Sequence, residues 1–141
     1  MNRQSLIASS LLACASLALP ACTIDRDTSP YAGQPDPDRP NVNPRIITST
    51  PDLMVALGFD EPIVASDSGN LRVAVPTRSL GDERYLLDYR FVFYDDRGME
   101  VEPVMGWRMF SLEPREQRRV EAQALDARAR DWRLQIKWAN R

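Results

Sequence analysis

Histidine is absent from the chain, and lysine and cysteine are almost absent. The 141 residues include no His, one Lys and two Cys, with 17 Arg and a formal net charge of -2. Without His the chain by itself forms no Ser-His-Asp triad, no Cys-His dyad and no His-ligated metal site, and two Cys are too few for a four-thiolate zinc site. We therefore expect no metal and no cofactor. The near-neutral charge gives no polybasic reason to expect nucleic acid as a partner.

The first 21 residues, MNRQSLIASSLLACASLALPA, have the pattern of a secretory signal peptide. Arg3 is their only charge, and an uncharged stretch rich in Leu and Ala runs from Leu6 to Leu19. The segment Leu19-Pro20-Ala21-Cys22 resembles the bacterial lipobox, in which an aliphatic residue stands three places before the Cys and a small residue directly before it. This resemblance implies cleavage between Ala21 and Cys22 and attachment of lipid to the thiol of Cys22.

Other interpretations of this segment stay open. The segment Leu11-Leu12-Ala13-Cys14 also matches the lipobox, but cleavage there leaves too short an apolar run, so we favour Cys22. The 19 uncharged residues from Leu6 to Ile24 are almost enough for an uncleaved anchor helix, although Pro20 and the serines make it a weak span. Ordinary secretion without lipid is the remaining alternative.

Lipidation at Cys22 leaves the mature protein without a thiol or a disulfide, because Cys14 departs with the signal peptide. Its stability then depends on an apolar core rather than on cross-links. The residue after the lipidated Cys is Thr23 and not Asp. By resemblance to the enterobacterial sorting rule, this favours the periplasmic face of the outer membrane, where two or three acyl chains make the attachment effectively permanent.

Residues 23–44, TIDRDTSPYAGQPDPDRPNVNP, predict a tether rather than a folded unit. Proline occurs five times, and the large apolar residues are only Ile24, Tyr31 and Val42. Such a segment buries too little surface to offset its ordering entropy, so we expect residues 22–44 to be a lipidated Cys followed by a disordered linker. A proline-rich chain extends by about 3.1 Å per residue, so this one reaches up to roughly 70 Å.

The sequence after residue 44 predicts one all-β domain over residues 45–141. A chain of this length allows one ordinary domain plus tails rather than two domains. Short apolar runs alternate with turn residues, and Ile46-Ile47 and Leu53 to Leu57 are the candidate early strands. Leu71 to Val75 alternates as a further strand, which Pro76 limits to the edge or the end of a sheet.

The second half of the domain contains the clearest strand. From Tyr85 to Tyr94, apolar side chains alternate with Asp88 and Arg90, and an Asp-Asp-Arg-Gly turn follows at residues 95–98. We expect Met99 to Val104 to return as the hairpin partner. Six to eight strands in about 97 residues have the size of an immunoglobulin-like antiparallel β-sandwich. Further strands are expected from Trp107 to Leu112 and from Trp132 to Trp138. The stretch from Arg115 to Arg130 is ambiguous, because its Arg, Glu, Gln and Ala are good helix formers, and we expect a strand from Arg118 to Ala124 followed by a loop.

The segment YRFVFYDDRGMEV, residues 89–101, resembles the YcfL-like family of bacterial periplasmic lipoproteins, whose function is largely uncharacterised. Members carry a lipobox and then the pattern Tyr-Arg-Phe-x-Trp-Tyr/Phe-Asp-x-x-Gly-x-Glu; Phe93 stands where Trp is usual. The resemblance covers residues 70–141 and the lipobox. It implies a β-sandwich lipoprotein of the outer membrane with neighbours in cell-wall maintenance, and it supplies no catalytic residues. The matching positions are Tyr89, Arg90, Phe91, Tyr94, Asp95, Gly98 and Glu100.

Carboxylates and arginines are the candidate site residues. Asp95, Asp96, Glu100 and Glu102 flank one turn, and paired carboxylates serve glycoside hydrolysis or hold Ca²⁺. Glu100 and Glu102 alternate with Met99 and Val101, as on an exposed strand face, so we favour a solvated hairpin tip. Residues 115–141 carry a net charge of +4, against -7 for residues 22–114. A patch that pairs with an anionic partner is one interpretation, and a solvated face paired with the acidic half is the other. The candidate patch is Arg115, Arg118, Arg119, Arg128 and Arg130.

The three tryptophans divide into two kinds. Trp132 and Trp138 lie at alternating strand positions and are expected in the core, whereas Trp107 stands between Gly106 and Arg108 and is a candidate exposed binding residue. We expect a lipid-anchored, non-enzymatic interaction or accessory module in the periplasm. Its partner is an envelope protein or a cell-wall component, docked at a sheet edge or on the arginine-rich face.

Three alternative functions have distinct structural requirements. A ligand-carrying lipoprotein requires an apolar cavity between the sheets, and a purely structural lipoprotein requires neither a cavity nor a partner. A cell-wall hydrolase requires two carboxylates about 5–10 Å apart across a pocket.

Overall fold

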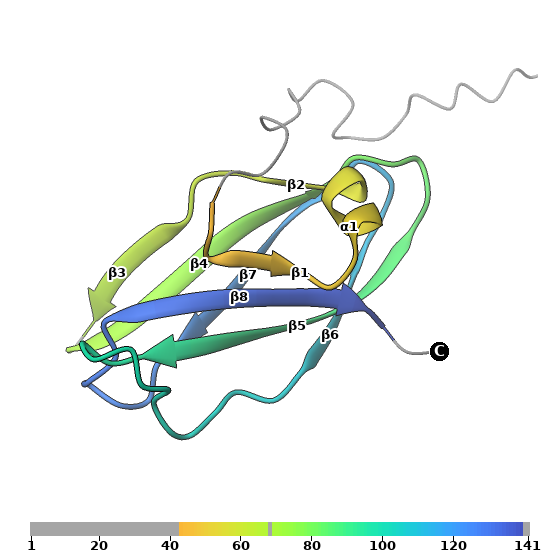
Figure 1. Ribbon diagram of the computed structural model, residues 1–141. Helices are drawn as coiled ribbons and strands as arrows, with labels where there is room; N and C mark the ends of the chain where they lie inside the picture. The colour runs from red at the N-terminus through yellow and green to blue at the C-terminus, as the bar shows by residue number, and fades with distance from the viewer. Residues whose placement is uncertain (1–42, 68, 140–141) are drawn as a thin grey trace, which may run out of the picture.

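The computed structural model describes residues 43–67 and 69–139 of the 141-residue chain. The predicted signal peptide, Cys22 and the linker up to residue 42 lie outside the described residues. No helix in the described part of the chain is long and apolar enough to cross a membrane. The elements, in chain order, are β1 (Ile46–Thr48), α1 (Pro51–Ala56), β2 (Leu57–Phe59), β3 (Ile63–Asp67), β4 (Asn70–Ser79), β5 (Tyr85–Tyr94), β6 (Arg108–Leu112), β7 (Gln117–Gln123) and β8 (Asp131–Trp138) (Figure 1).

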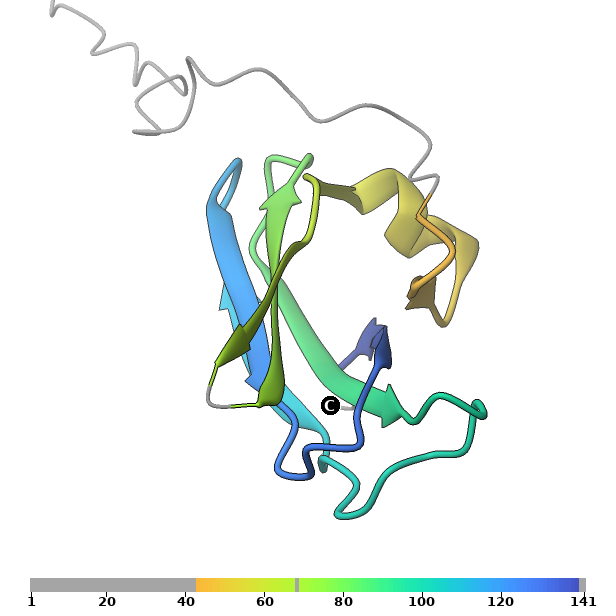
Figure 2. The ribbon, with the colours of Figure 1, turned by 90° about the vertical axis from the view of Figure 1, so that its left-hand side faces the viewer.

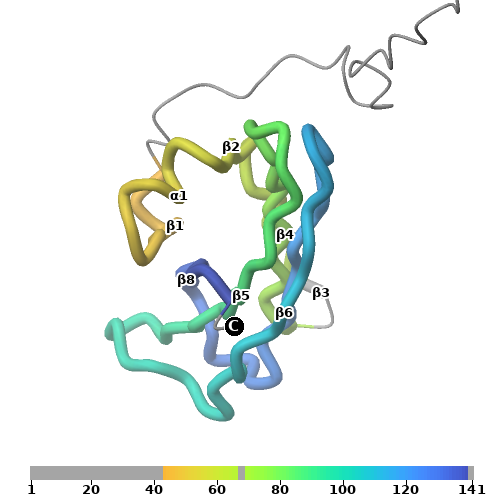
Figure 3. Tube along the Cα trace, turned by 90° about the vertical axis from the view of Figure 1, so that its right-hand side faces the viewer, coloured from red at the N-terminus to blue at the C-terminus, as the bar shows by residue number. Residues whose placement is uncertain are grey.

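The strands form two sheets that face each other, as the predicted β-sandwich requires. In sheet A the order is β1-β8-β5-β6, with β1 parallel to β8 and the other pairs antiparallel. In sheet B, β4 is central, with β7 along one edge and β2 and β3 along the other. Figures 2 and 3 show the two layers from opposite sides, with β4 and β7 in one layer and β1 and β8 in the other. The all-β prediction is confirmed.

Pro76 neither ends its strand nor lies at a sheet edge, so that prediction is wrong. The strand β4 continues through Pro76 to Ser79 and is the central strand of sheet B. The N–H of Asp60 donates to the carbonyl of Pro76 (3.1 Å), and the reciprocal bond is missing because proline has no N–H. At this point the neighbouring chain leaves the ladder, and Glu61 and Pro62 stand opposite the single residue Val75. The break between β2 and β3 thus coincides with the missing donor.

A short helix occupies the segment predicted as a strand from Leu53 to Leu57, and only Leu57 lies in a strand. Pro51 stands in the first turn of α1, where its fixed φ suits a helix and its missing N–H costs nothing, and Asp52 follows it. The helix lies between β1 and β2 (Figure 1), and its residue Leu53 is fully buried. Because β1 belongs to sheet A and β2 to sheet B, we interpret α1 as a cover over the core on the side where these two strands lie apart.

The hairpin that follows β5 differs from the prediction in its second strand. β5 runs from Tyr85 to Tyr94 as predicted, and Gly98 has the positive φ of +79° that the turn requires. Residues 99–104 form only one isolated bridge, between Tyr94 and Glu100, and Pro103 follows a cis peptide bond. β5 instead pairs with β6 on one side, with Leu87 opposite Phe110, and with β8 on the other.

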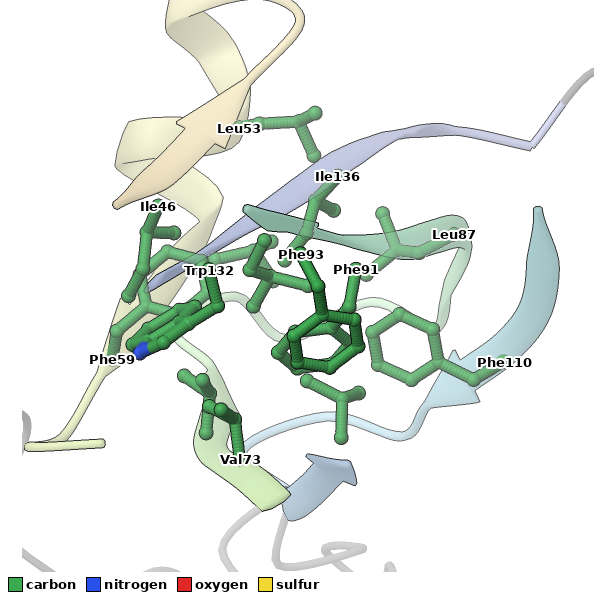
Figure 4. Close-up of a cluster of buried hydrophobic side chains, with 14 of the residues drawn as sticks. Ile46, Leu53, Phe59, Val73, Leu87, Phe91, Phe93, Phe110, Trp132 and Ile136 are labelled. Carbon is green, nitrogen blue, oxygen red and sulfur yellow. The ribbon is translucent and has the colours of Figure 1, made fainter. Parts of the chain in front are cut away.

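The core lies between the sheets and is rich in aromatic rings. Phe91 is fully buried, with ring centroids of Phe93 at 6.2 Å and Trp132 at 6.0 Å (Figure 4). The alternation predicted for β8 is confirmed, because Trp132, Leu134 and Ile136 are all buried. Val120 is the buried residue of β7, which confirms a strand rather than a helix in that ambiguous stretch. Alternate residues of the long strands thus supply much of the core, and α1 and the short strands β1 and β2 add to it.

Candidate functional site

The four carboxylates near the first turn do not gather into one site. The carboxylate of Asp95 accepts hydrogen bonds from the backbone N–H groups of Arg97 (2.9 Å) and Met99 (2.8 Å), so it stabilises its own turn. The carboxylate of Glu102 likewise accepts from the N–H of Val104 (3.1 Å). Asp95 and Asp96 line a depression of about 520 Å³, which Glu100 and Glu102 do not line.

Asp131 joins Asp95 and Asp96 in that depression, with Arg130 and Arg133 beside it. Burial by itself raises the pKa of the Asp131 carboxyl. The hydrogen bond from Arg45 (Nε to Oδ1, 2.7 Å), the N–H of Trp132 and the nearby charges outweigh burial and hold this pKa below its ordinary value. A general acid in a glycosidase needs a raised pKa, so the environment of Asp131 acts in the opposite direction.

The five arginines predicted to form a patch lie at two ends of the sandwich. Arg115 and Arg118 stand at the start of β7, whereas Arg128 and Arg130 follow its far end, about 20 Å away at 3.3 Å per strand residue (Figure 1). Arg119 lies on β7 opposite Pro76 of β4. The structure therefore does not bring the five side chains together.

Most of these arginines have a partner within the domain. Arg115 pairs with Asp82 (3.1 Å), and Arg118 donates from Nη1 to the carbonyl of Ser111 (3.0 Å) on the edge strand β6. Arg128 pairs with Asp126 (2.7 Å), and this side-chain hydrogen bond holds the pKa of the Asp126 carboxyl below its ordinary value. The pairing fits the alternative of a solvated face neutralised by acidic residues of the same domain.

Trp107 lies on the outer face of sheet A and is 40% exposed. The guanidinium carbon of Arg90 is 4.8 Å from the centroid of its ring, and Nζ of Lys137 is 4.6 Å from the same centroid. These are cation–π contacts from two different strands, β5 and β8. We call Trp107, Arg90, Lys137 and their neighbours Asp88 and Gln135 the Trp107 cluster.

The other two tryptophans are less exposed than Trp107. Trp132 is 4% exposed and lies in the core, as predicted. Trp138 is half-buried and packs edge-on against Tyr85, with 5.5 Å between the ring centroids. This pair lines a shallow depression of about 630 Å³ beside Leu86. The sequence therefore separated Trp107 from the buried Trp132 correctly, whereas Trp138 lies at the margin of the core and not within it. The sequence did not reveal the two cations that reach the Trp107 ring.

Strand β3 forms an exposed edge of sheet B that the sequence analysis missed. Ile63 is 50% exposed and Val64 is 51% exposed, and residues 63–66 are all exposed. Within the part of the chain that the structure describes, β3 pairs with β4 alone. The signal in the sequence is the run Ile-Val-Ala after Pro62, which is too short and too uniform to distinguish a strand from a loop.

Within residues 43–67 and 69–139, no group of three or more Asp, Glu, Cys or His side chains is arranged to hold a metal ion. The two surfaces described above are the exposed edge of β3 and the Trp107 cluster on the outer face of sheet A.

Comparison with known proteins identifies the family. The model of the family described as "Protein of unknown function (DUF1425)" matches residues 45–138, and the chain belongs to this family. The crystal structure of a DUF1425 family member from Shewanella sp. pv-4 is similar to this chain, with a TM-score of 0.54 and 25% identity over 60% of this chain and 80% of that one.

A second structure supports the fold. The crystal structure of Campylobacter jejuni cj0090 has a TM-score of 0.59 and 22% identity to this chain, over 69% of this chain and 100% of that one. At this identity the likeness shows a shared fold alone. None of the curated proteins compared matches the chain.

Proposed function

We propose that this protein is a lipid-anchored module of the bacterial envelope, held at the periplasmic face of the outer membrane, and that it binds another envelope protein without catalysing a reaction. The lipobox at residues 19–22 and the proline-rich segment after it support the anchor. The resemblance of residues 89–101 to the YcfL-like lipoproteins supports the location.

The observation that carries the binding role is the free edge of β3. In an antiparallel ladder, alternate residues point their N–H and C=O groups toward the partner strand and away from it. The N–H of Asp60 bonds to Pro76, so the even-numbered residues of β4 point toward β2 and β3. Ala65 faces Arg72 and is bonded to β4, and Val64 and Ser66 therefore present their backbone groups to solvent.

This edge has few of the features that prevent an edge strand from pairing with another chain. Ile63, Val64 and Ala65 carry no charge, whereas on edge strand β6 the side chain of Arg118 covers the carbonyl of Ser111. An extended segment of a partner protein can add to β3 as another strand through backbone hydrogen bonds, with Ile63 and Val64 supplying apolar contacts. We assign the edge to such a segment.

The anchor is tested by replacing Cys22. Cys22→Ala is expected to abolish labelling with radioactive palmitate and to move the protein from the membrane pellet to the soluble fraction, because the acyl chains no longer have an attachment atom. Cys14→Ala is the matched control and is expected to leave both labelling and pelleting unchanged. Labelling that survives Cys22→Ala and disappears with Cys14→Ala would place the anchor at the other cysteine.

The edge is tested with proline at Ser66, which removes one free N–H without breaking the ladder to β4. Crosslinking in cells and recovery from membranes is expected to yield about three- to tenfold less of the partner with Ser66→Pro, the effect of one hydrogen bond. Ser66→Ala is the matched control and keeps the N–H. Equal recovery from the two variants, or a crosslinked product that contains only this chain, contradicts the proposal.

A further inference from the structure

The outer face of sheet A places three side chains in one row across the strands. Gln135 on β8 stands opposite Arg90 on β5, and the ladder that pairs Tyr89 with Arg108 continues to Trp107 beside Arg90. The next row holds Lys137, Asp88 and Met109. Side chains from three places in the sequence therefore meet in the Trp107 cluster.

Arg90 is a half-buried cation whose only hydrogen-bond partner in the described residues is neutral. Its Nε donates to the amide oxygen of Gln135 (2.7 Å), and its guanidinium packs on Trp107. In the described residues no carboxylate forms an ion pair with Arg90, although charges withdrawn from water are usually paired. The two Nη groups of Arg90 thus keep their donors, in the planar arrangement that matches a carboxylate.

Lys137 adds a second positive charge at the same ring. Its ion pair with Asp88 is long, at 3.9 Å, and its side chain is 29% exposed. Arg90 and Lys137 repel each other across Trp107, and one carboxylate, Asp88, offsets only one of the two charges. The cluster therefore has a net charge of +1, and a singly charged anion beside Arg90 neutralises it.

The surroundings of the cluster combine apolar side chains with one further cation, Arg133, which stands opposite Val92. Met109 is 71% exposed and Leu86 is 41% exposed, both on the outer face of sheet A. Val92, on the same face of β5 as Arg90, is only 3% exposed, so side chains exclude water from this part of the sheet. Ion pairing is stronger where water is excluded, and an apolar body attached to the anion gains contacts with Trp107 and Met109.

We propose that the Trp107 cluster is a binding site for a carboxylate carried by a small apolar or sugar-containing ligand. The carboxylate accepts hydrogen bonds from the Nη groups of Arg90 and is attracted by Lys137, and the body of the ligand lies against Trp107. The site is on sheet A and is independent of the β3 edge on sheet B, so either proposal can fail without the other.

The test follows the indole N–H signals of the whole chain, purified from membranes in neutral detergent, by NMR. Acetyl-dialanine and glucuronate are the probes, and acetyl-dialanine amide is the uncharged control. We expect the signal of Trp107, assigned by its loss in Trp107→Phe, to shift saturably with a carboxylate and not with the amide. The signals of Trp132 and Trp138 serve as internal controls for a change that affects the whole fold.

Three substitutions identify the residues that act. Arg90→Gln is expected to weaken binding about tenfold, because a charge-assisted hydrogen bond is lost, and Arg72→Gln on sheet B is expected to change nothing. Asp88→Asn is expected to strengthen binding, because it removes the one negative charge of the cluster. A merely structural role of these residues does not predict that gain.

Several results overturn the proposal. These are a Trp107 signal that does not respond to either carboxylate, an equal response to the amide, and equal effects of Arg90→Gln and Arg72→Gln. A further arm uses vesicles made of equal parts of phosphatidylglycerol and phosphatidylcholine. Binding to these vesicles that requires Arg90, together with no response to the carboxylates, assigns the cluster to lipid phosphate and also overturns it.

Discussion

Replacing Phe91 with alanine is expected to lower the free energy of unfolding by about 3–5 kcal/mol, the range for removing a large buried aromatic side chain. Phe91 is fully buried in the centre of β5, with the ring centroids of Phe93 and Trp132 at 6.2 Å and 6.0 Å from its own. The loss combines the transfer of the ring into water with the cavity that remains, since neighbouring side chains close it only in part.

The measurement for Phe91 is equilibrium unfolding in urea, carried out on the whole chain with Cys22→Ala in the background to keep it soluble. Leu86→Ala is the matched control, because Leu86 belongs to the same strand, faces the other way and is 41% exposed. We expect the control to cost less than about 1 kcal/mol. Similar losses for the two variants would show that Phe91 does not hold the two sheets together.

Leu53→Ala is expected to cost about 2–5 kcal/mol, although the helix that carries Leu53 has only six residues. A helix this short is unstable alone and exists because its apolar side packs on the domain. Leu53 is fully buried and is the buried residue of α1. Its truncation removes the contact that holds α1 over the core.

The matched control for Leu53 lies two residues along the same helix. Val55 is 67% exposed, and alanine is the better helix former, so Val55→Ala is expected to change stability by no more than about 0.5 kcal/mol. Urea unfolding of both variants in the same background gives the comparison. A loss with Val55→Ala as large as that with Leu53→Ala would mean that α1 contributes through its backbone and not through the buried leucine.

Two errors in the prediction, the strand assigned from Leu53 to Leu57 and the edge position assigned to Pro76, have one cause, because each outcome depends on a distant segment of the chain. The segment from Leu53 to Leu57 is apolar and β-compatible, and only the space between β1 and β2 makes a helix the better solution there. Pro76 was assigned to an edge because proline removes a ladder hydrogen bond. Sheet B accepts it at the centre because the chain opposite bulges at Glu61 and Pro62, about 15 residues earlier in the sequence.

The candidate sites likewise combine local features that the sequence predicts with contacts that depend on distant segments. Trp107 was separated from the core tryptophans by its local sequence, but Arg90 and Lys137 reach it from β5 and β8, 17 residues before it and 30 residues after it. The five arginines are near one another in sequence, yet a strand of seven residues separates Arg115 and Arg118 from Arg128 and Arg130. Proximity along the chain therefore predicted the wrong neighbours for the arginines, and it indicated no neighbours for Trp107.

The sequence by itself determined the features that depend on local periodicity and composition. These are the all-β class, the strands β5, β7 and β8 with their buried faces, and the turn at Gly98. Alternation along a strand fixes which side chains face the core, because successive residues point to opposite faces. Only the tertiary structure decided the pairing of β5 with β6, the central place of β4, the cover formed by α1, the free edge at β3 and the Trp107 cluster. Each of these depends on which distant segments lie side by side, and a periodic pattern does not encode its partner.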